Sequence, residues 1–184
     1  RHPYNIKRFF AAMKHSLDYY TAHFGPYQFR QLRILEFPDY RQYAESFANT
    51  IPVSESLGFI ADLRKSSDID YVTYFTAHEA AHQWWGYQTP GARVQGAKVL
   101  DESLEQYSAL MVMKHLYGPT AMRKFLKYEL DGYLSGRAGE SAAEEPLARV
   151  DDQPYIHYDK GSVIFYALQD YIGEDQVDAA LPAW

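Results

Sequence analysis

The stretch "FTAHEAAHQWWG", residues 75–86, restricts the fold more than any other part of the chain. It places His78 and His82 four residues apart, with Glu79 directly after the first histidine. Positions i and i+4 lie on one face of an α-helix, about one turn apart. The spacing therefore predicts a helix here, with two imidazole rings that point to a common centre.

Two histidines and a glutamate in the order H-E-x-x-H are the metal-binding pattern of zinc hydrolases. Neutral imidazoles bind Zn²⁺, the ion lowers the pKa of its water to about 7, and the carboxylate takes the proton of that water. The chain has no cysteine, so any metal must be held by His, Asp or Glu. We predict that His78 and His82 are zinc ligands and that Glu79 is the general base. A chance match to the pentad is the alternative, and the zinc interpretation requires a third ligand.

Two carboxylates open the next helical stretch, residues 101–118, and either is a candidate for that ligand. A negative charge is favoured at the start of a helix by the helix dipole. An aspartate directly before an apolar helical run is usually the N-cap, so we assign Asp101 to the cap and Glu102 to the metal. Glu105, one turn further on, is either a partner of a metal ligand or a solvated charge on the helix surface.

The rest of the chain predicts an α+β fold, with a small mixed sheet followed by a helical half. The central helix has Asp70 as its expected N-cap and Gly86 as its expected C-cap. A long polar loop is expected over residues 135–154. The expected strands lie within residues 28–38 and 47–62, and the expected helices within residues 5–25, 68–86, 101–118, 120–134 and 158–173.

Composition narrows the class of protein. The chain has 184 residues, of which 47% are hydrophobic and 23% are charged, so residues 1–184 are expected to form a single domain. The formal net charge of −6 argues against a broad basic surface for nucleic acid. No apolar run is long enough for a membrane helix, so we expect no membrane contact by this segment. Oligomeric state and compartment are not indicated by the sequence.

Three blocks of sequence resemble the aminopeptidase N family of gluzincin metallopeptidases. The stretch "HEAAHQWWG" is similar to the family's H-E-x-x-H-Q-W-[FW]-G, and "LDESLEQY" is similar to its L-N-E-G-F-A-x-Y. The second resemblance implies that Glu102 is the third ligand. Nineteen residues (83–101) separate His82 from Glu102, whereas the family has eighteen. This difference leaves Asp101 as the competing ligand.

The third block, "HYDKGSVIFYAL", resembles the family's Y-E-K-G-A-x-V-L and implies that Tyr158 donates a hydrogen bond to the oxyanion. Together the blocks imply a thermolysin-like zincin catalytic domain with one Zn²⁺ per chain and a peptide substrate. The sequence of these blocks is also similar to that of peptidase domains attached to some bacterial ABC-type permeases. The chain is therefore expected to be a domain excised from a longer, membrane-anchored bacterial protein.

The resemblance departs from the family at the segment that binds the substrate amine. Aminopeptidases carry G-[AG]-M-E-N on an edge strand, and the aligned stretch here is "YAESF", residues 43–47. Ser46 takes the place of the amine-binding glutamate, and Glu45 is the nearby acid. Neighbouring side chains on a strand point to opposite faces, so Glu45 replaces that glutamate only if the register shifts or a bulge re-aims it.

The sequence thus predicts a zinc metallopeptidase that is aminopeptidase-like but has an altered amine-binding motif. Two functions of other classes remain open. One is a catalytically silent domain that binds peptide, or senses it for a membrane transporter. The other is a zinc hydrolase that acts on a non-peptide ester or epoxide.

Overall fold

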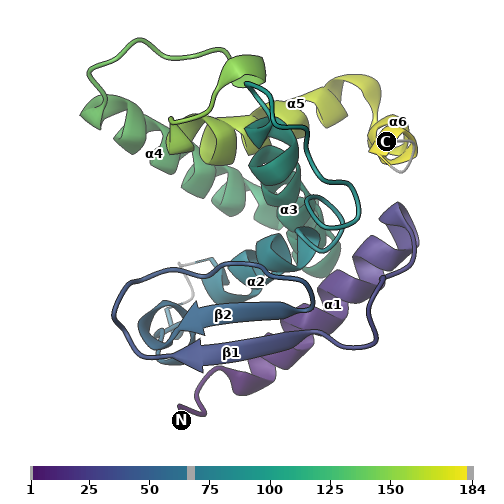
Figure 1. Cartoon of the computed structure of the whole chain (residues 1–184), viewed down its shortest axis with the longest axis vertical. Helices are drawn as coiled ribbons and strands as arrows, with labels where there is room; N and C mark the ends of the chain where they lie inside the picture. The colour runs from purple at the N-terminus through teal and green to yellow at the C-terminus, as the bar shows by residue number, and fades with distance from the viewer. Residues whose placement is uncertain (1, 66–68, 182–184) are drawn as a thin grey trace.

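The computed structural model describes residues 2–65 and 69–181. A small sheet and two helices form one half of the molecule, and the remaining helices form the other half (Figure 1). The strands are β1 (Arg33–Phe37) and β2 (Thr50–Ser54), and the α-helices are α1 (Ile6–Phe24), α2 (Tyr71–Ala81), α3 (Leu104–Tyr117), α4 (Met122–Gly139), α5 (Gly161–Ile172) and α6 (Glu174–Ala180). Three π-helical turns are η1 (Glu55–Phe59), η2 (Val99–Ser103) and η5 (Ile156–Lys160), and two 3₁₀ turns are η3 (Pro119–Ala121) and η4 (Leu147–Arg149).

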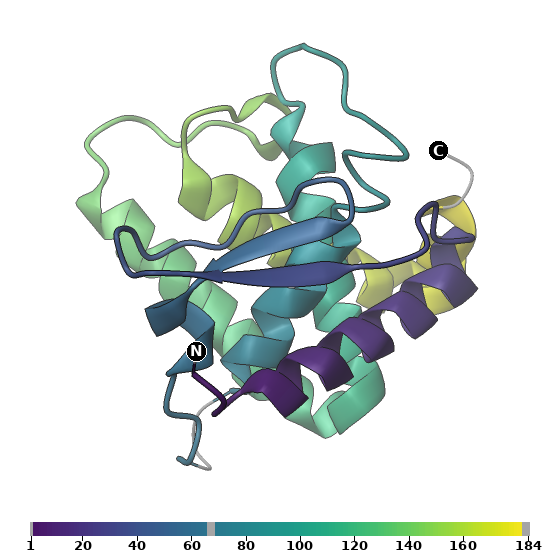
Figure 2. The same ribbon diagram turned by 60° about the horizontal axis from the view of Figure 1, so that its bottom comes forward.

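The sheet lies across α1 and α2 (Figure 2). Its strands β1 and β2 are parallel. The side chains of Ile51 and Val53 in β2 are fully buried where the sheet packs on these two helices. Antiparallel bridges from Ala44 to Val53 and from Phe47 to Thr50 add the segment 44–47 on the other side of β2. The prediction of a small mixed sheet is therefore confirmed.

Helix α2 is the central element of the fold. Asp70 is its N-cap as predicted, because its carboxylate accepts a hydrogen bond of 3.2 Å from the backbone N–H of Thr73. Every residue from Val72 to Ala81 is buried, since α1 and the sheet cover one side of the helix and α3 covers another. The predicted C-cap was wrong: His82 caps the helix, and Gly86 lies in the turns that follow, with a φ of 109°.

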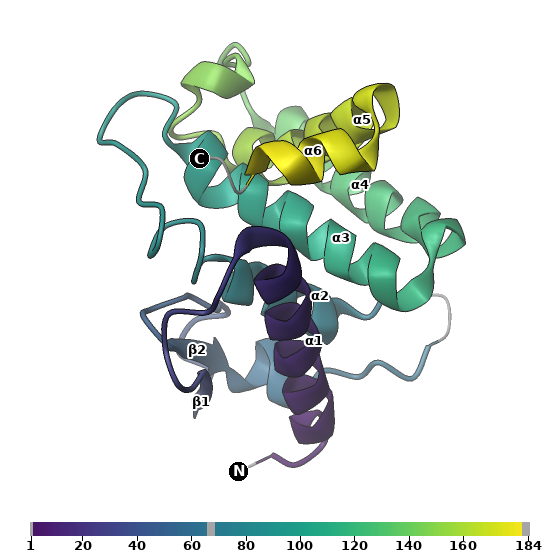
Figure 3. The ribbon, with the colours of Figure 1, turned by 90° about the vertical axis from the view of Figure 1, so that its right-hand side faces the viewer.

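The helical half stacks α3, α4, α5 and α6 on one side of the molecule (Figure 3). The N-cap role predicted for Asp101 was wrong, because the chain is already helical from Val99 and enters α3 through the π turn η2. The expected loop at 135–154 begins later, since α4 continues to Gly139. No helix among the described residues is long and apolar enough to cross a membrane.

Two glycines let α4 approach the π turn η5 closely. A Cβ atom at Gly132 would lie 2.7 Å from Oδ1 of Asp159, and one at Gly136 would meet the side chain of Tyr155. These distances are shorter than van der Waals contact, so larger residues would force the two elements apart. On another side, η5 packs against the turn η2, which leads into α3.

Candidate metal centre

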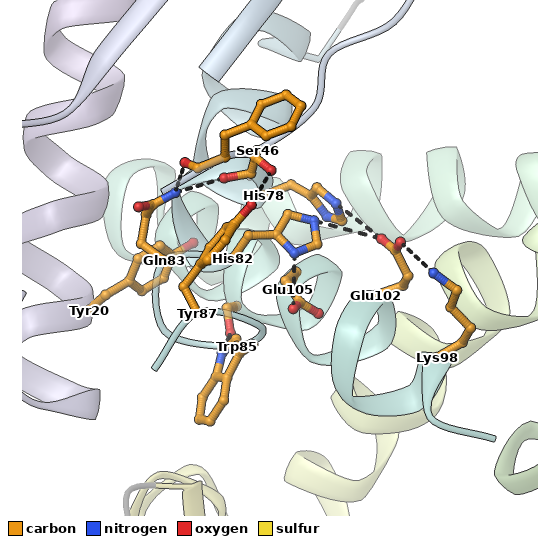
Figure 4. A network of polar contacts seen from close by, with 12 residues as sticks. Tyr20, Ser46, His78, His82, Gln83, Trp85, Tyr87, Lys98, Glu102 and Glu105 are labelled. Carbon is orange, nitrogen blue, oxygen red and sulfur yellow. Dashed lines mark hydrogen bonds and ion pairs between the residues drawn. The ribbon is translucent and has the colours of Figure 1, made fainter. Parts of the chain in front are cut away.

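Helix α2 and the turn η2 bring His78, His82 and Glu102 together (Figure 4). One ligand atom from each residue lies within 4.8 Å of the other two. The Oε2 atom of Glu102 is 3.6 Å from Nε2 of His78 and 3.7 Å from Nε2 of His82. The two imidazole rings are nearly perpendicular, at 87°, with their centroids 4.9 Å apart.

This donor set fits a zinc ion. The Oε2 atom of Glu102 is buried and has no hydrogen-bond partner among the described residues, although two imidazole nitrogens face it. Burial acts to raise the pKa of Glu102, but His78, His82 and Tyr158 hold it at about 2, so the carboxylate is ionised. Two imidazole nitrogens and one carboxylate oxygen are a ligand set typical of catalytic zinc sites.

Asp101 takes a different direction from Glu102. Its Oδ1 atom would lie 3.0 Å from a Cβ atom on Gly91, so its carboxylate rests against the loop that follows α2.

The turn η2 closes with an i to i+5 hydrogen bond from the N–H of Leu104 to the carbonyl of Val99. Such a turn holds one more residue than an α-helical turn. The spacing between His82 and Glu102 exceeds the family's by the same amount.

Two further side chains, Glu105 and Lys98, contact the candidate ligands from outside the cluster (Figure 4). The Oε1 atom of Glu105 lies 3.2 Å from Nδ1 of His82, and Glu105 is 0% exposed, which rules out a solvated charge. Lys98 donates a hydrogen bond of 3.4 Å to Oε1 of Glu102. Sequence reasoning missed Lys98, because it lies between the two expected helices, 68–86 and 101–118; its signal was its position four residues before Glu102.

The predicted catalytic residues lie beside the cluster. Glu79 is 7% exposed, its Oε2 atom has no hydrogen-bond partner in the described parts of the chain, and burial raises its pKa. The ring of Tyr158 lies 5.7 Å from that of His78, and burial together with Glu102 raises the pKa of its hydroxyl. The phenol is therefore protonated at neutral pH and is able to donate a hydrogen bond.

A cavity of about 710 Å³ opens over these groups and is bordered by residues 44–46 of the edge segment. Both Glu45 and Ser46 line it. The hydroxyl of Ser46 accepts a hydrogen bond of 2.7 Å from Nε2 of Gln83, and its carbonyl accepts one of 2.8 Å from the hydroxyl of Tyr87. Because the bridges at Ala44 and Phe47 are in register with each other, no bulge re-aims Glu45, which is exposed at the cavity rim.

Gln83 is a second residue that sequence reasoning missed. Its amide group donates to Ser46 and, at 2.9 Å, to the carbonyl of Phe47, and it accepts a hydrogen bond of 2.8 Å from the N–H of Asn49. The side chain is fully buried. It therefore ties the edge segment to the end of α2, close to His82.

Comparison with known proteins gives a consistent result. Residues 9–184 match the sequence profile of the Peptidase family M1 domain. The chain is 26% identical over 170 residues to the probable aminopeptidase 1 of Sulfurisphaera tokodaii, and this match covers 86% of this chain and 21% of that protein. It is 27% identical over 168 residues to the human endoplasmic reticulum aminopeptidase 2, covering 87% of this chain and 17% of that protein.

The chain thus spans about a fifth of the length of the curated relatives that it matches. A solved structure, a mutant of the M1 zinc metallopeptidase from Deinococcus radiodurans, superposes with a TM-score of 0.66 at 19% sequence identity. The match covers 95% of this chain and 35% of that one. The two proteins share their fold over nearly all of this chain.

Proposed function

The chain belongs to the M1 family of peptidases, and on this premise we propose that it hydrolyses peptide bonds with one zinc ion held by His78, His82 and Glu102. The observation that carries the proposal is the buried, unpartnered Oε2 atom of Glu102, which faces two imidazole nitrogens at 3.6 and 3.7 Å. When bound, zinc would supply a Lewis acid that polarises the substrate carbonyl and lowers the pKa of water.

Glu79 is proposed as the general base and later the general acid. Its buried carboxylate has a raised pKa and a free Oε2 atom at the cavity. A base of this kind takes a proton from the attacking water and returns it to the leaving amine. The Tyr158 hydroxyl is proposed to donate a hydrogen bond to the carbonyl oxygen as negative charge develops there.

The substrate backbone is proposed to lie along the edge segment 44–47, where main-chain hydrogen bonds would orient it. Ser46 offers only a neutral hydroxyl, which is already bonded to Gln83. A neutral hydroxyl does not replace a charge-assisted hydrogen bond to an ammonium group. We therefore propose that this domain selects weakly for a free substrate α-amine, unlike an aminopeptidase.

A mixed peptide library, incubated with zinc-loaded protein, tests the activity directly. We expect cleavage by the wild type and none by Glu79→Gln, while the variant retains zinc. Absence of cleavage by the zinc-loaded wild type would favour a silent peptide-binding domain. Hydrolysis of ester or epoxide substrates in a parallel assay, with peptides left intact, would instead favour a non-peptide hydrolase.

A further inference from the structure

A second cavity, of about 360 Å³, adjoins the metal centre. It shares His78, Glu79 and Tyr158 with the first cavity, but it extends along α2 toward the N-terminus of that helix, past Phe75 and Tyr71. The residue positions 71, 75 and 79 follow one face of the helix. A substrate group that leaves the reacting centre in this direction therefore enters the second cavity.

Besides Glu79, one carboxylate in this cavity lacks a partner. The side chain of Asp159 makes no hydrogen bond or ion pair with any residue that the structure describes, and its own backbone carbonyl accepts the hydroxyl of Ser162. Burial, with a smaller effect of Glu129, raises the pKa of Asp159 to about 7. Gly132 provides the space in which the carboxylate sits.

A buried glutamate near the cavity and the lysine next to Asp159 are already engaged. Glu129, behind the wall of the cavity, accepts hydrogen bonds from Tyr74 at 2.8 Å, Gln106 at 3.0 Å and Ser162 at 3.0 Å. Lys160, next to Asp159 in the chain, bonds Glu144 at 3.0 Å instead. Apart from Glu79, the proposed general base, Asp159 is thus the carboxylate among the described lining residues that is free to pair with an incoming cation.

The walls have the composition of a cation site. Aromatic residues line it from several parts of the chain, among them Tyr71 and Phe75 on α2 and Tyr128 on α4. No lysine or arginine is among the lining residues that the structure describes. Faces of aromatic rings attract ammonium and guanidinium groups, and a partly buried carboxylate forms a charge-assisted hydrogen bond with either.

We propose that this second cavity binds the cationic side chain of a lysine or arginine residue beside the cleaved peptide bond, with Asp159 as its charge partner. The proposal rests on the proposed peptidase function and names its substrate class. Asp159 follows Tyr158 directly in the chain, so a substrate whose carbonyl meets the Tyr158 hydroxyl brings a neighbouring side chain toward Asp159.

Three peptides that differ only at the residue beside the cleaved bond provide the test: lysine, norleucine and glutamate. For the wild type we expect kcat/KM to be on the order of tenfold higher with lysine than with norleucine, and lowest with glutamate. Asp159→Asn should reduce the ratio of lysine to norleucine to near one. Equal rates for lysine and norleucine in the wild type, or a preference that survives Asp159→Asn, would overturn the proposal.

Two further variants separate this effect from a general loss of structure. Gly132→Ala pushes the Asp159 carboxylate out of place and should also lower the ratio of lysine to norleucine. Asp131→Asn, which removes an exposed acid from the same helix, should leave that ratio at the wild-type value. A ratio that falls equally in all three variants would contradict the assignment to Asp159.

Binding without turnover distinguishes failure of this proposal from failure of the proposed function. Zinc-loaded Glu79→Gln protein is titrated calorimetrically with the lysine and norleucine peptides. Tighter binding of the lysine peptide, lost when Asp159→Asn is added, would support the cation site even if the wild type cleaves no peptide. Equal binding of the two peptides would reject the cation site even if the wild type is an active peptidase.

Discussion

The hydroxyl of Ser103 donates a hydrogen bond of 2.6 Å to the backbone carbonyl of His157. Ser103 directly follows Glu102, and His157 directly precedes Tyr158, so this bond ties the proposed third ligand to the proposed oxyanion donor. Both ends lie in π turns, η2 and η5. Gly161 adds to the same contact, because a Cβ atom there would collide with the Ser103 side chain.

Ser103→Ala should therefore destabilise the fold at this junction. The change leaves a buried carbonyl without its partner, which costs about 1–2 kcal/mol in the free energy of unfolding. Denaturant unfolding of the metal-free protein measures the loss. Ser135→Ala, at an exposed position on α4, is the matched control and should be neutral. Equal stability of the two variants would show that the bond contributes nothing.

Glu105 should support zinc affinity through His82. Its carboxylate contacts Nδ1 of His82 at 3.2 Å and thereby orients the ring. Loss of such a partner lowers metal affinity by roughly 10- to 100-fold, so we expect this weakening for Glu105→Ala in a competition titration against a chelator. Glu145→Gln, at an exposed position, should bind zinc as the wild type does. Unchanged affinity in Glu105→Ala would mean that the contact is only packing.

Asp159 should make stability depend on pH. Its folded pKa, about 7, is above the ordinary aspartate value of 3.8, so the folded state binds the proton more tightly than the unfolded state does. The resulting stabilisation is complete below pH 4 and is lost as the pH rises to about 7. The asparagine of Asp159→Asn does not ionise, so this variant does not lose stability in that way. It should melt at a higher temperature than the wild type at pH 8, but not at pH 4. A difference in melting temperature that is constant across this range would contradict the pKa assignment.

Cleavage of one peptide and of its N-acetylated form tests selection for the α-amine. Because Ser46 is neutral and bonded to Gln83, acetylation should change kcat/KM by less than about threefold, whereas an enzyme that pairs the amine with a buried acid loses far more. If acetylation stops cleavage, Glu45 or another acid recognises the amine. Glu45→Gln would then show whether Glu45 is that acid.

Local signals in the sequence were sufficient where one element decides the structure. The cap at Asp70 depends only on a side chain and the backbone three residues later, and both follow from helix geometry. The small mixed sheet and the helical half follow from hydrophobic periodicity in the same way. In the candidate site, one helical turn is enough to bring His78 and His82 to the same face, so the pentad alone predicted that they lie together.

Features that depend on packing between elements could not be predicted. The π turn η2 replaced the expected cap at Asp101, because nothing local distinguishes i to i+5 from i to i+4 hydrogen bonding. Lys98 and Gln83 contact their partners only after the loops are placed. The space around Asp159 depends on Gly132, which is far from it in the sequence but packs against it in the fold. A single glycine within a helical pattern does not indicate which residue it will contact.

The most direct test of the zinc assignment is a crystal structure of the zinc-loaded protein, with anomalous diffraction recorded at the zinc absorption edge. The account predicts one zinc ion per chain, bound by Nε2 of His78, Nε2 of His82 and the carboxylate of Glu102, with Asp101 still directed at Gly91. Zinc bound by Asp101 in place of Glu102, or no anomalous peak between the two histidines, would contradict it.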